Sequence, residues 1–337
     1  MSIRADSCWF DHRRAPSVVM VLAAVVWCCT ASWATAGSCQ TALRPQDQVW
    51  IASTRGQGGP CQRMALRFLR CRPAAGRHSA TWQSANPGAF LEETSAARQT
   101  VFYVHGNLVS RSEARRRTLA VYRSLRRHLE DEFPLRLVGL SWPTNRVRGT
   151  MLKDVRTKAA RARPASFQLA QLVDKMDPET PIGMIGFSLG ARVITGALHL
   201  LGGGRLGGAA LQQRVHAERL PVRVVLMASA LNDDWLLPSR YHGRALSQVD
   251  RMLLLNNDCD RAMRWYRLTD RCRRPEALGF RGLAGFGRLG AARAKIQQRD
   301  VCCEVGRQHD FLHYVHHAGL MRQTWSCLAV PDAGRAS

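Results

Sequence analysis

Short apolar runs alternate with longer amphipathic stretches along most of the 337-residue chain. Short apolar runs are typical of buried strands, and apolar positions three or four residues apart are typical of helices. The alternation predicts a mostly parallel sheet flanked by helices. We predict strands at residues 48–54, 65–69, 100–104, 135–140, 181–187, 222–228, 252–255 and 300–305. We predict helices at residues 111–130, 150–176, 189–201, 260–268 and 312–328.

The breaks in this pattern separate elements of one domain. Residues 56–60 have the Gly and Pro content of a turn between the first two strands. Pro164 is expected to interrupt the helix at 150–176, because proline lacks the backbone N–H. Residues 279–290 show no clear period and predict a loop. With no internal repeat visible, we predict a single domain over residues 37–337 with lid-like insertions.

The N-terminal segment has the pattern of a secretory signal peptide. Arg4, Arg13 and Arg14 precede an apolar run at residues 15–29, and the small residues Ala34-Thr35-Ala36 follow. A basic start, an apolar centre and small residues before the cleavage point define such peptides. We therefore predict a signal peptide at residues 1–36 and an exported protein, periplasmic or extracellular. A retained membrane anchor is the alternative.

Cleavage after residue 36 would leave eight of the eleven cysteines. An even number in an exported chain is expected to form disulfides, although the sequence does not give their pairing. None of the eight has the paired spacing of a zinc site, so we predict no metal. The eight are Cys39, Cys61, Cys71, Cys259, Cys272, Cys302, Cys303 and Cys327.

The formal net charge of +24 comes almost entirely from arginine, since only four of the 49 basic residues are lysines. A field of this sign attracts anionic surfaces such as membranes and nucleic acids. We prefer the simpler interpretation, that these arginines form solvated helix faces. An anionic membrane surface stays open as a partner. No basic stretch is interleaved with aromatic residues, so no specific nucleic-acid partner is predicted.

The sequence Gly186-Phe187-Ser188-Leu189-Gly190 lies between a predicted strand and a predicted helix. A Gly-x-Ser-x-Gly sequence in this strand–turn–helix setting predicts a nucleophile elbow, with Ser188 as the attacking residue. The glycines allow a strained turn that bulkier residues would obstruct. An ordinary glycine-rich turn is the structural alternative.

Two backbone N–H groups are expected to stabilise the oxyanion of an acyl-transfer reaction. One is the N–H of Leu189, at the start of the helix after the elbow. The other comes from the turn that follows the strand at 100–104, and is the N–H of Asn107 or Leu108. His105, in the same turn, precedes the nucleophile, and we interpret it as a structural histidine that braces the turn.

The acid of a catalytic triad is expected after the strand at 252–255. Asp258 and Asp260 both lie there, and we rank Asp260 first because the residues after it resemble a helix start. The aspartate that is not the acid would cap that helix. Asp233 and Asp234, after the preceding strand, are the minority alternative.

The base is expected in the loop after the last strand. His309 lies nearest to the end of the predicted strand at 300–305, and His313 is the alternative. A metal site formed by these two histidines, four residues apart, is discounted because no His-Glu-x-x-His glutamate accompanies them. The predicted triad is Ser188, Asp260 and His309, and it requires no cofactor.

Several of these sequences together resemble bacterial α/β-hydrolases of the uncharacterised serine esterase or lipase-like type. They are Asp47–Ile51 before Ser53-Thr54-Arg55, Tyr103–Asn107, Ser141-Trp142-Pro143, the elbow, and the late Val-Gly-x-x-His. The resemblance covers residues 45–328 and implies the α/β-hydrolase fold and a serine hydrolase that cleaves a small-molecule or lipid ester. An acyltransferase is one alternative. A catalytically silent scaffold that binds an anionic envelope component is the other.

Overall fold

The computed structural model describes residues 43–56, 66–73, 80–92, 98–212, 214–216, 218–269 and 272–330. The predicted signal peptide at residues 1–36 lies outside this part of the chain, as do residues 57–60 of the predicted turn. Among the described residues, none of the helices is long and apolar enough to cross a membrane.

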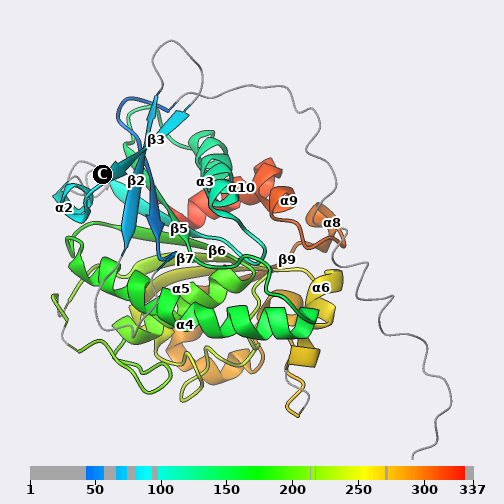
Figure 1. Cartoon of the computed structure of the whole chain (residues 1–337). Helices are drawn as coiled ribbons and strands as arrows, with labels where there is room; N and C mark the ends of the chain where they lie inside the picture. Colours follow the sequence, from blue (N-terminus) through cyan, green and yellow to red (C-terminus); the bar gives the residue numbers. More distant parts are fainter. Residues whose placement is uncertain are drawn as a thin grey trace, which may run out of the picture. The chain divides into compact units, whose positions relative to one another are not determined.

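A nine-stranded sheet forms the centre of the described residues (Figure 1). Its strands are β1 (Gln48–Ser53), β2 (Arg67–Pro73), β3 (Ala80–Ala85), β4 (Gln99–Val104), β5 (Leu135–Ser141), β6 (Ile182–Phe187), β7 (Val222–Met227), β8 (Val249–Asn256) and β9 (Ile296–Asp300). Their order is β3-β2-β1-β5-β4-β6-β7-β8-β9. All neighbours from β1 to β9 are parallel, whereas β2 is antiparallel to both β1 and β3. The sheet is therefore mostly parallel, as predicted, with an antiparallel edge.

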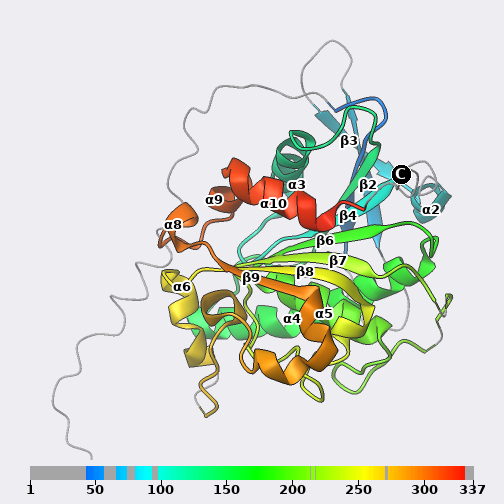
Figure 2. The ribbon, with the colours of Figure 1, turned by 180° about the vertical axis from the view of Figure 1, so that it is seen from behind.

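Helices cover both faces of the sheet (Figures 1 and 2). One face carries α3 (Arg111–Arg126), α9 (Phe311–His316) and α10 (Ala318–Leu328), and the other carries α4 (Met151–Lys175) and α5 (Leu189–Leu201). The shorter elements are α2 (Pro87–Glu92), α6 (Arg261–Arg264), α7 (Leu278–Arg281), α8 (Cys302–Val305) and the 3-10 helices η2 (Ala245–Gln248), η3 (Tyr266–Thr269) and η4 (Phe286–Lys295).

The central strands are buried along their whole length because of this double cover. Successive side chains of a strand point to opposite faces. In β4, Phe102 and Val104 therefore join the hydrophobic cluster beneath α4 and α5. Val101 and Tyr103 join a second cluster beneath α3 and α10. The sheet thus separates two cores, and each strand stabilises both.

The chain reverses its direction across the sheet at β4 and β6. β5, which follows α3, pairs with one side of β4, and β6, which follows α4, pairs with the other side. Because parallel crossovers are right-handed, this reversal places α3 and α4 on opposite faces. Open α/β sheets bind ligands outside the carboxyl ends of the strands at such a reversal. The turn at His105 follows β4, and Ser188 follows β6, so both lie at this point.

Two predictions about helices are wrong. Pro164 does not interrupt α4, which continues from residue 151 to residue 175. Pro164 and Ala160, whose carbonyl loses its N–H partner, are both exposed residues, so this position is on the solvent side of the helix. The predicted helix at 312–328 is divided into α9 and α10 by the extended backbone of His317 (ψ 105°), whose ring accepts a hydrogen bond from Leu320 N–H.

The predicted last strand, at residues 300–305, is also wrong. The last strand is β9, which ends at Asp300, and most of the predicted segment forms α8. β9 lies at the edge of the sheet and is largely polar, with only Ile296 buried. Its apolar pattern was therefore too weak to predict it. β3 was missed for the same reason at the opposite edge, and the helix at 260–268 is shortened to α6 followed by η3.

Pro164 provides a test of this account of α4. We expect Pro164→Ala to raise the free energy of unfolding by about 1–3 kcal/mol, because alanine restores the N–H and favours the helix. Urea unfolding of both chains, at equal m-value, measures the difference. A variant less stable than the wild type would contradict this account.

Candidate active site

Ser188 has a backbone conformation that few residues other than glycine adopt. Its φ is 54° and its ψ is −120°, at the junction between β6 and α5. Such a backbone persists only where the surrounding structure fixes it. The Ser188 N–H donates to the carbonyl of Met227 at 2.9 Å, and the Ser188 carbonyl accepts from Ala230 N–H at 3.1 Å. The turn is thus fixed from β7 and the residues after it.

The two glycines of the elbow are required by close approach of neighbouring backbone. A Cβ added to Gly186 would lie 2.9 Å from Cα of Ala191, in the first turn of α5. A Cβ added to Gly190 would lie only 2.0 Å from the carbonyl oxygen of Val104, at the end of β4. These contacts set the start of α5 directly against the carboxyl ends of β4 and β6.

The three residues of the predicted triad form one hydrogen-bonded chain. His309 Nε2 lies 2.8 Å from Ser188 Oγ, and His309 Nδ1 lies 2.7 Å from Asp260 Oδ2. Because an ionised carboxylate only accepts, Nδ1 carries the proton and donates to Asp260. Nε2 is then free to accept the proton of the Ser188 hydroxyl. The serine follows β6, the acid precedes α6, and the histidine lies in the loop after α8.

Asp260 is fully buried at the N-terminus of α6. Its Oδ1 accepts hydrogen bonds from the N–H groups of Ala262 (2.8 Å) and Met263 (3.0 Å). Burial raises the pKa of Asp260, but the charge and hydrogen bond of His309, with these two N–H groups, outweigh it and lower that pKa below its ordinary value. The ionised form therefore stabilises the fold above the ordinary pKa of an aspartate. This contribution is lost as the pH falls through the lowered pKa.

The other predicted acids do not contact His309. Asp258 is exposed, and its N–H donates to Asp300 Oδ2 at 3.1 Å. Asp234 pairs with Arg240 at 3.4 Å. Burial and the nearby charge of Asp234 raise the pKa of Asp233.

The competing histidine has a different partner. His313 is exposed, and its Nδ1 lies 3.0 Å from the carbonyl oxygen of Val305. His309 is therefore the histidine that the fold brings to the serine. The ring of Phe187, the residue before Ser188, packs against the His309 ring, with 5.0 Å between the ring centroids. This contact restricts the orientation of the imidazole.

His105 braces the turn after β4, as its position suggested. Its Nδ1 lies 2.9 Å from the carbonyl oxygen of Gly106, and its Nε2 accepts from Trp142 N–H at 3.3 Å. The Trp142 indole N–H also donates to the His105 carbonyl at 2.9 Å. Burial lowers the pKa of His105 to about 3. The ring is therefore neutral at physiological pH and has both nitrogens engaged.

The predicted second oxyanion donor lies in this turn. A Cβ added to Gly106 would lie 2.8 Å from Ser188 Cβ, so the turn directly contacts the elbow. Leu108 N–H donates to the carbonyl of Thr144 at 3.1 Å and to Asn107 Oδ1 at 2.8 Å. Its N–H is thus engaged. The Asn107 N–H donates to no acceptor among the described residues, which leaves it as the better candidate of the two.

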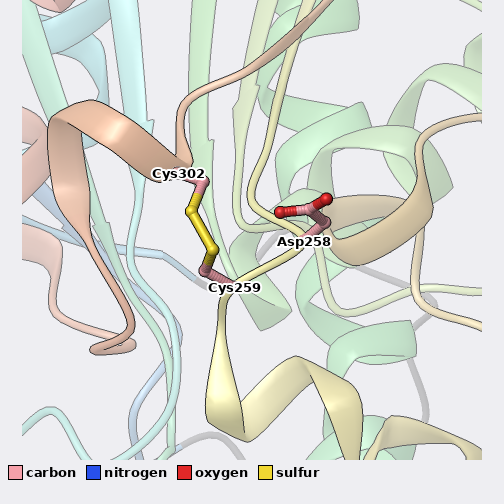
Figure 3. Close-up of side chains that lie close together, drawn as sticks. All are labelled: Asp258, Cys259 and Cys302. Carbon is pink, nitrogen blue, oxygen red and sulfur yellow. A yellow bond between two sulfur atoms is a disulfide. The ribbon is translucent and has the colours of Figure 1, made fainter.

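A disulfide between Cys259 and Cys302 (Figure 3) joins the segments that lead to Asp260 and His309. Cys259, the residue before Asp260, is bonded to Cys302 at the start of α8. Asn257 Nδ2 also donates to the carbonyl of Gly306 at 2.7 Å, three residues before His309. The sequence did not reveal this pairing, because eight cysteines allow on the order of 100 arrangements.

One group of potential metal ligands occurs in the described part of the chain. The ligand atoms of Asp258, Cys259 and Cys302 lie within 4.8 Å of one another (Figure 3). Metals bind the thiolate form of cysteine, whereas these two sulfurs are bonded to each other. The disulfide therefore leaves Asp258 as the one ligand of this group.

A cavity of about 300 Å³ opens beside the acid loop. None of Ser188, His309 and Asp260 is among its lining residues, so the cavity is separate from this hydrogen-bonded group. Its lining is rich in charged side chains: Asp258, Arg264, Arg267, Glu276, Phe280 and Arg281.

No protein-family model matches the sequence, and no curated protein matches it at a significant level. Among solved structures, the chain is similar to a lipase-esterase related protein from Clostridium acetobutylicum. The two are 12% identical, with a TM-score of 0.29, over 68% of this chain and 95% of the other.

The disulfide provides a test of how these loops are held. We expect Cys259→Ser/Cys302→Ser to lower the free energy of unfolding by about 4 kcal/mol. The disulfide closes a loop with a sequence separation of 43, and without it the unfolded chain gains conformational entropy. Cys303→Ser, at the exposed neighbouring position, is the matched control and should leave stability within about 0.5 kcal/mol. Equal stability of the double variant and the control would contradict the expectation.

Proposed function

We propose that this protein is a serine hydrolase with the α/β-hydrolase fold that cleaves carboxylic esters through an acyl-enzyme on Ser188. The observation that carries the proposal is the hydrogen-bonded chain from Asp260 through His309 to Ser188, at 2.7 and 2.8 Å. A nucleophile in contact with a base, which is itself oriented by a buried acid, is the arrangement that activates serine.

In the first half of the reaction, Ser188 Oγ attacks the ester carbonyl carbon while its proton passes to His309 Nε2. The resulting imidazolium is stabilised by the carboxylate of Asp260. The tetrahedral intermediate then collapses, and the alcohol leaves with the proton from Nε2. In the second half, a water molecule gives a proton to Nε2 and attacks the acyl carbon. The bond between this carbon and Ser188 Oγ then breaks, the proton returns from Nε2 to Oγ, and the carboxylic acid is released.

The negative charge on the carbonyl oxygen would be stabilised by the backbone N–H groups of Leu189 and Asn107. Leu189 is the first residue of α5, so its N–H has no acceptor within the helix and lies at the positive end of the helix dipole. The contact between Gly106 and Ser188 supports a second donor from the neighbouring turn. Donors that are fixed before the reaction lose little energy in reorganisation.

The proposal includes export and an ester substrate, either a small molecule or a lipid. The Cys259–Cys302 disulfide supports export, because such bonds persist in oxidising compartments. The excess of arginine is compatible with an anionic membrane surface as a partner. No step of this mechanism draws on a cofactor.

A fluorophosphonate probe tests the nucleophile. We expect the wild-type chain to be labelled and Ser188→Ala to show no labelling, because the probe bonds covalently to an activated serine. Labelling is read as a mass increase on the peptide that contains residue 188. A variant that is still labelled would refute Ser188 as the nucleophile, and an unreactive wild type would favour the silent scaffold that binds an envelope component.

The acid is tested by a pair of variants two residues apart. We expect Asp260→Asn to lower kcat by about 10³- to 10⁴-fold, because the amide can no longer accept the Nδ1 proton and selects the wrong tautomer of His309. Asp258→Asn, the exposed alternative, should keep kcat within about twofold, since it does not contact His309. The hydrolysis of a 4-nitrophenyl ester gives both values. The opposite order would assign the acid to Asp258.

A further inference from the structure

Arg55 joins three sequence segments that the proposed mechanism leaves unexplained. Arg55 is the last residue of the Ser53-Thr54-Arg55 sequence and lies two residues after the end of β1. It is buried, with 5% of the residue exposed. Its Nε donates to the hydroxyl of Ser141, the last residue of β5, at 2.8 Å. One terminal nitrogen donates to Asn145 Oδ1 at 2.5 Å. The other terminal nitrogen donates to the carbonyl of Val109 at 2.7 Å.

The third of these contacts fixes the turn that follows β4. The Val109 carbonyl also accepts from the Thr144 hydroxyl at 3.2 Å, so two donors hold it. Leu108, the residue before it, has a φ of 54°, which an L residue adopts only where its surroundings require it. The hydrogen bonds of Arg55 and Thr144 hold the turn in this conformation, because they attach it to the end of β1 and to the segment after β5.

The guanidinium of Arg55 is held by neutral oxygen atoms. Within the described residues, no carboxylate lies within 4.0 Å of it. Burial and the charge of Arg111 lower the pKa of Arg55 to about 10, so it is charged at neutral pH. After burial itself, this charge contributes to the lowered pKa of His105 in the same turn. A buried cation, with no carboxylate within 4.0 Å among the residues that the structure describes, therefore contacts the turn that lies against Ser188.

We propose that Arg55 is the positioning residue of the oxyanion site, which holds the turn at residues 105–109 so that the Asn107 N–H faces the substrate carbonyl oxygen. This inference rests on the proposed function. The planar guanidinium directs three N–H groups to three acceptors at once, whereas a lysine ammonium has a single nitrogen atom. The geometry therefore depends on arginine and cannot be reproduced by positive charge alone.

Two substitutions separate shape from charge. Arg55→Lys keeps a cation but loses the planar fork, and Arg55→Met removes both. We expect Arg55→Lys to lower kcat of a 4-nitrophenyl ester by about 10- to 100-fold with KM within about twofold, because a donor displaced by about 1 Å stabilises the transition state poorly. The inhibition constant of a trifluoromethyl ketone, whose adduct carries the same oxyanion, should rise by a similar factor.

Hydrogen exchange gives a readout that does not depend on turnover. The amide of Leu108 should exchange faster in both variants, because the turn opens more readily once the Val109 carbonyl loses one donor. If Arg55→Met does not fold, Arg55→Lys still supports both measurements.

Arg136→Lys is the matched control. Arg136 is buried like Arg55 and donates to Gln48 Oε1 and to the Phe90 carbonyl, both at 2.9 Å. It lies at the amino end of β5, however, whereas Ser188 follows the carboxyl end of the parallel strand β6. We expect this variant to lose stability while its kcat and inhibition constant stay at wild-type values.

Two results would overturn the role of Arg55 alone. One is an Arg55→Lys chain that loses stability but keeps wild-type kcat and ketone affinity. The other is unchanged exchange of the Leu108 amide. A wild-type chain that does not react with the fluorophosphonate would instead overturn the proposed function, and with it the role of Arg55. The two failures are therefore distinguishable.

Discussion

The close approach of α5 to the ends of β4 and β6 is the constraint on which the other features of the site depend. Gly190 lies so near the Val104 carbonyl that no side chain fits between them. Together with the hydrogen bonds of Ser188 to Met227 and Ala230, this contact restricts the backbone of Ser188, which follows the carboxyl end of β6. It also brings the turn at Gly106 against the serine. The candidate nucleophile and both candidate oxyanion donors thus lie beside one packing contact, and the strained backbone of Ser188 is an energetic cost of this arrangement.

The candidate acid Asp260 and the candidate base His309 come from the side of the sheet that ends in the edge strand β9, which has a strand neighbour on only one side. Short loops at a sheet edge are expected to open more easily than the core. Here they are joined by the Cys259–Cys302 bond and by Asp300, whose carboxylate accepts from the N–H groups of Asp258 and Cys302. These links restrict the loops around Asp260 and His309, whereas Ser188 is held by backbone hydrogen bonds to Met227 and Ala230.

Buried polar side chains occupy the ends of the strands, where backbone groups leave the hydrogen-bond ladder of the sheet. Arg55 and His105 both donate to carbonyls near the site, and Trp142 donates back to His105. A buried carbonyl without a donor costs free energy, so loops inside a protein need such partners. Part of the excess of arginine therefore has a structural use, in addition to the solvated surface that composition suggested.

The sequence by itself determined the parts of the molecule that depend on local pattern. The buried central strands have continuous apolar runs, and the elbow has glycines at fixed spacing, so β4, β6 and α5 were predicted within one or two residues. The edge strand β9 has neither signal, and its absence from the prediction moved the last strand onto α8.

Contacts between distant segments were decided only by the tertiary structure. Several aspartates and histidines satisfied the sequence order for the acid and the base. Asp260 was ranked first because the residues after it resemble a helix start, and His309 because it lies nearest to the predicted strand end. Which of them meet Ser188 depends on burial and on loop geometry, because Asp258 and Asp260 differ by two residues but face opposite environments. The disulfide and the contacts of Arg55 join residues 43 to 90 positions apart. Local pattern carries no information about such pairs, because they are formed by the packing of the whole sheet.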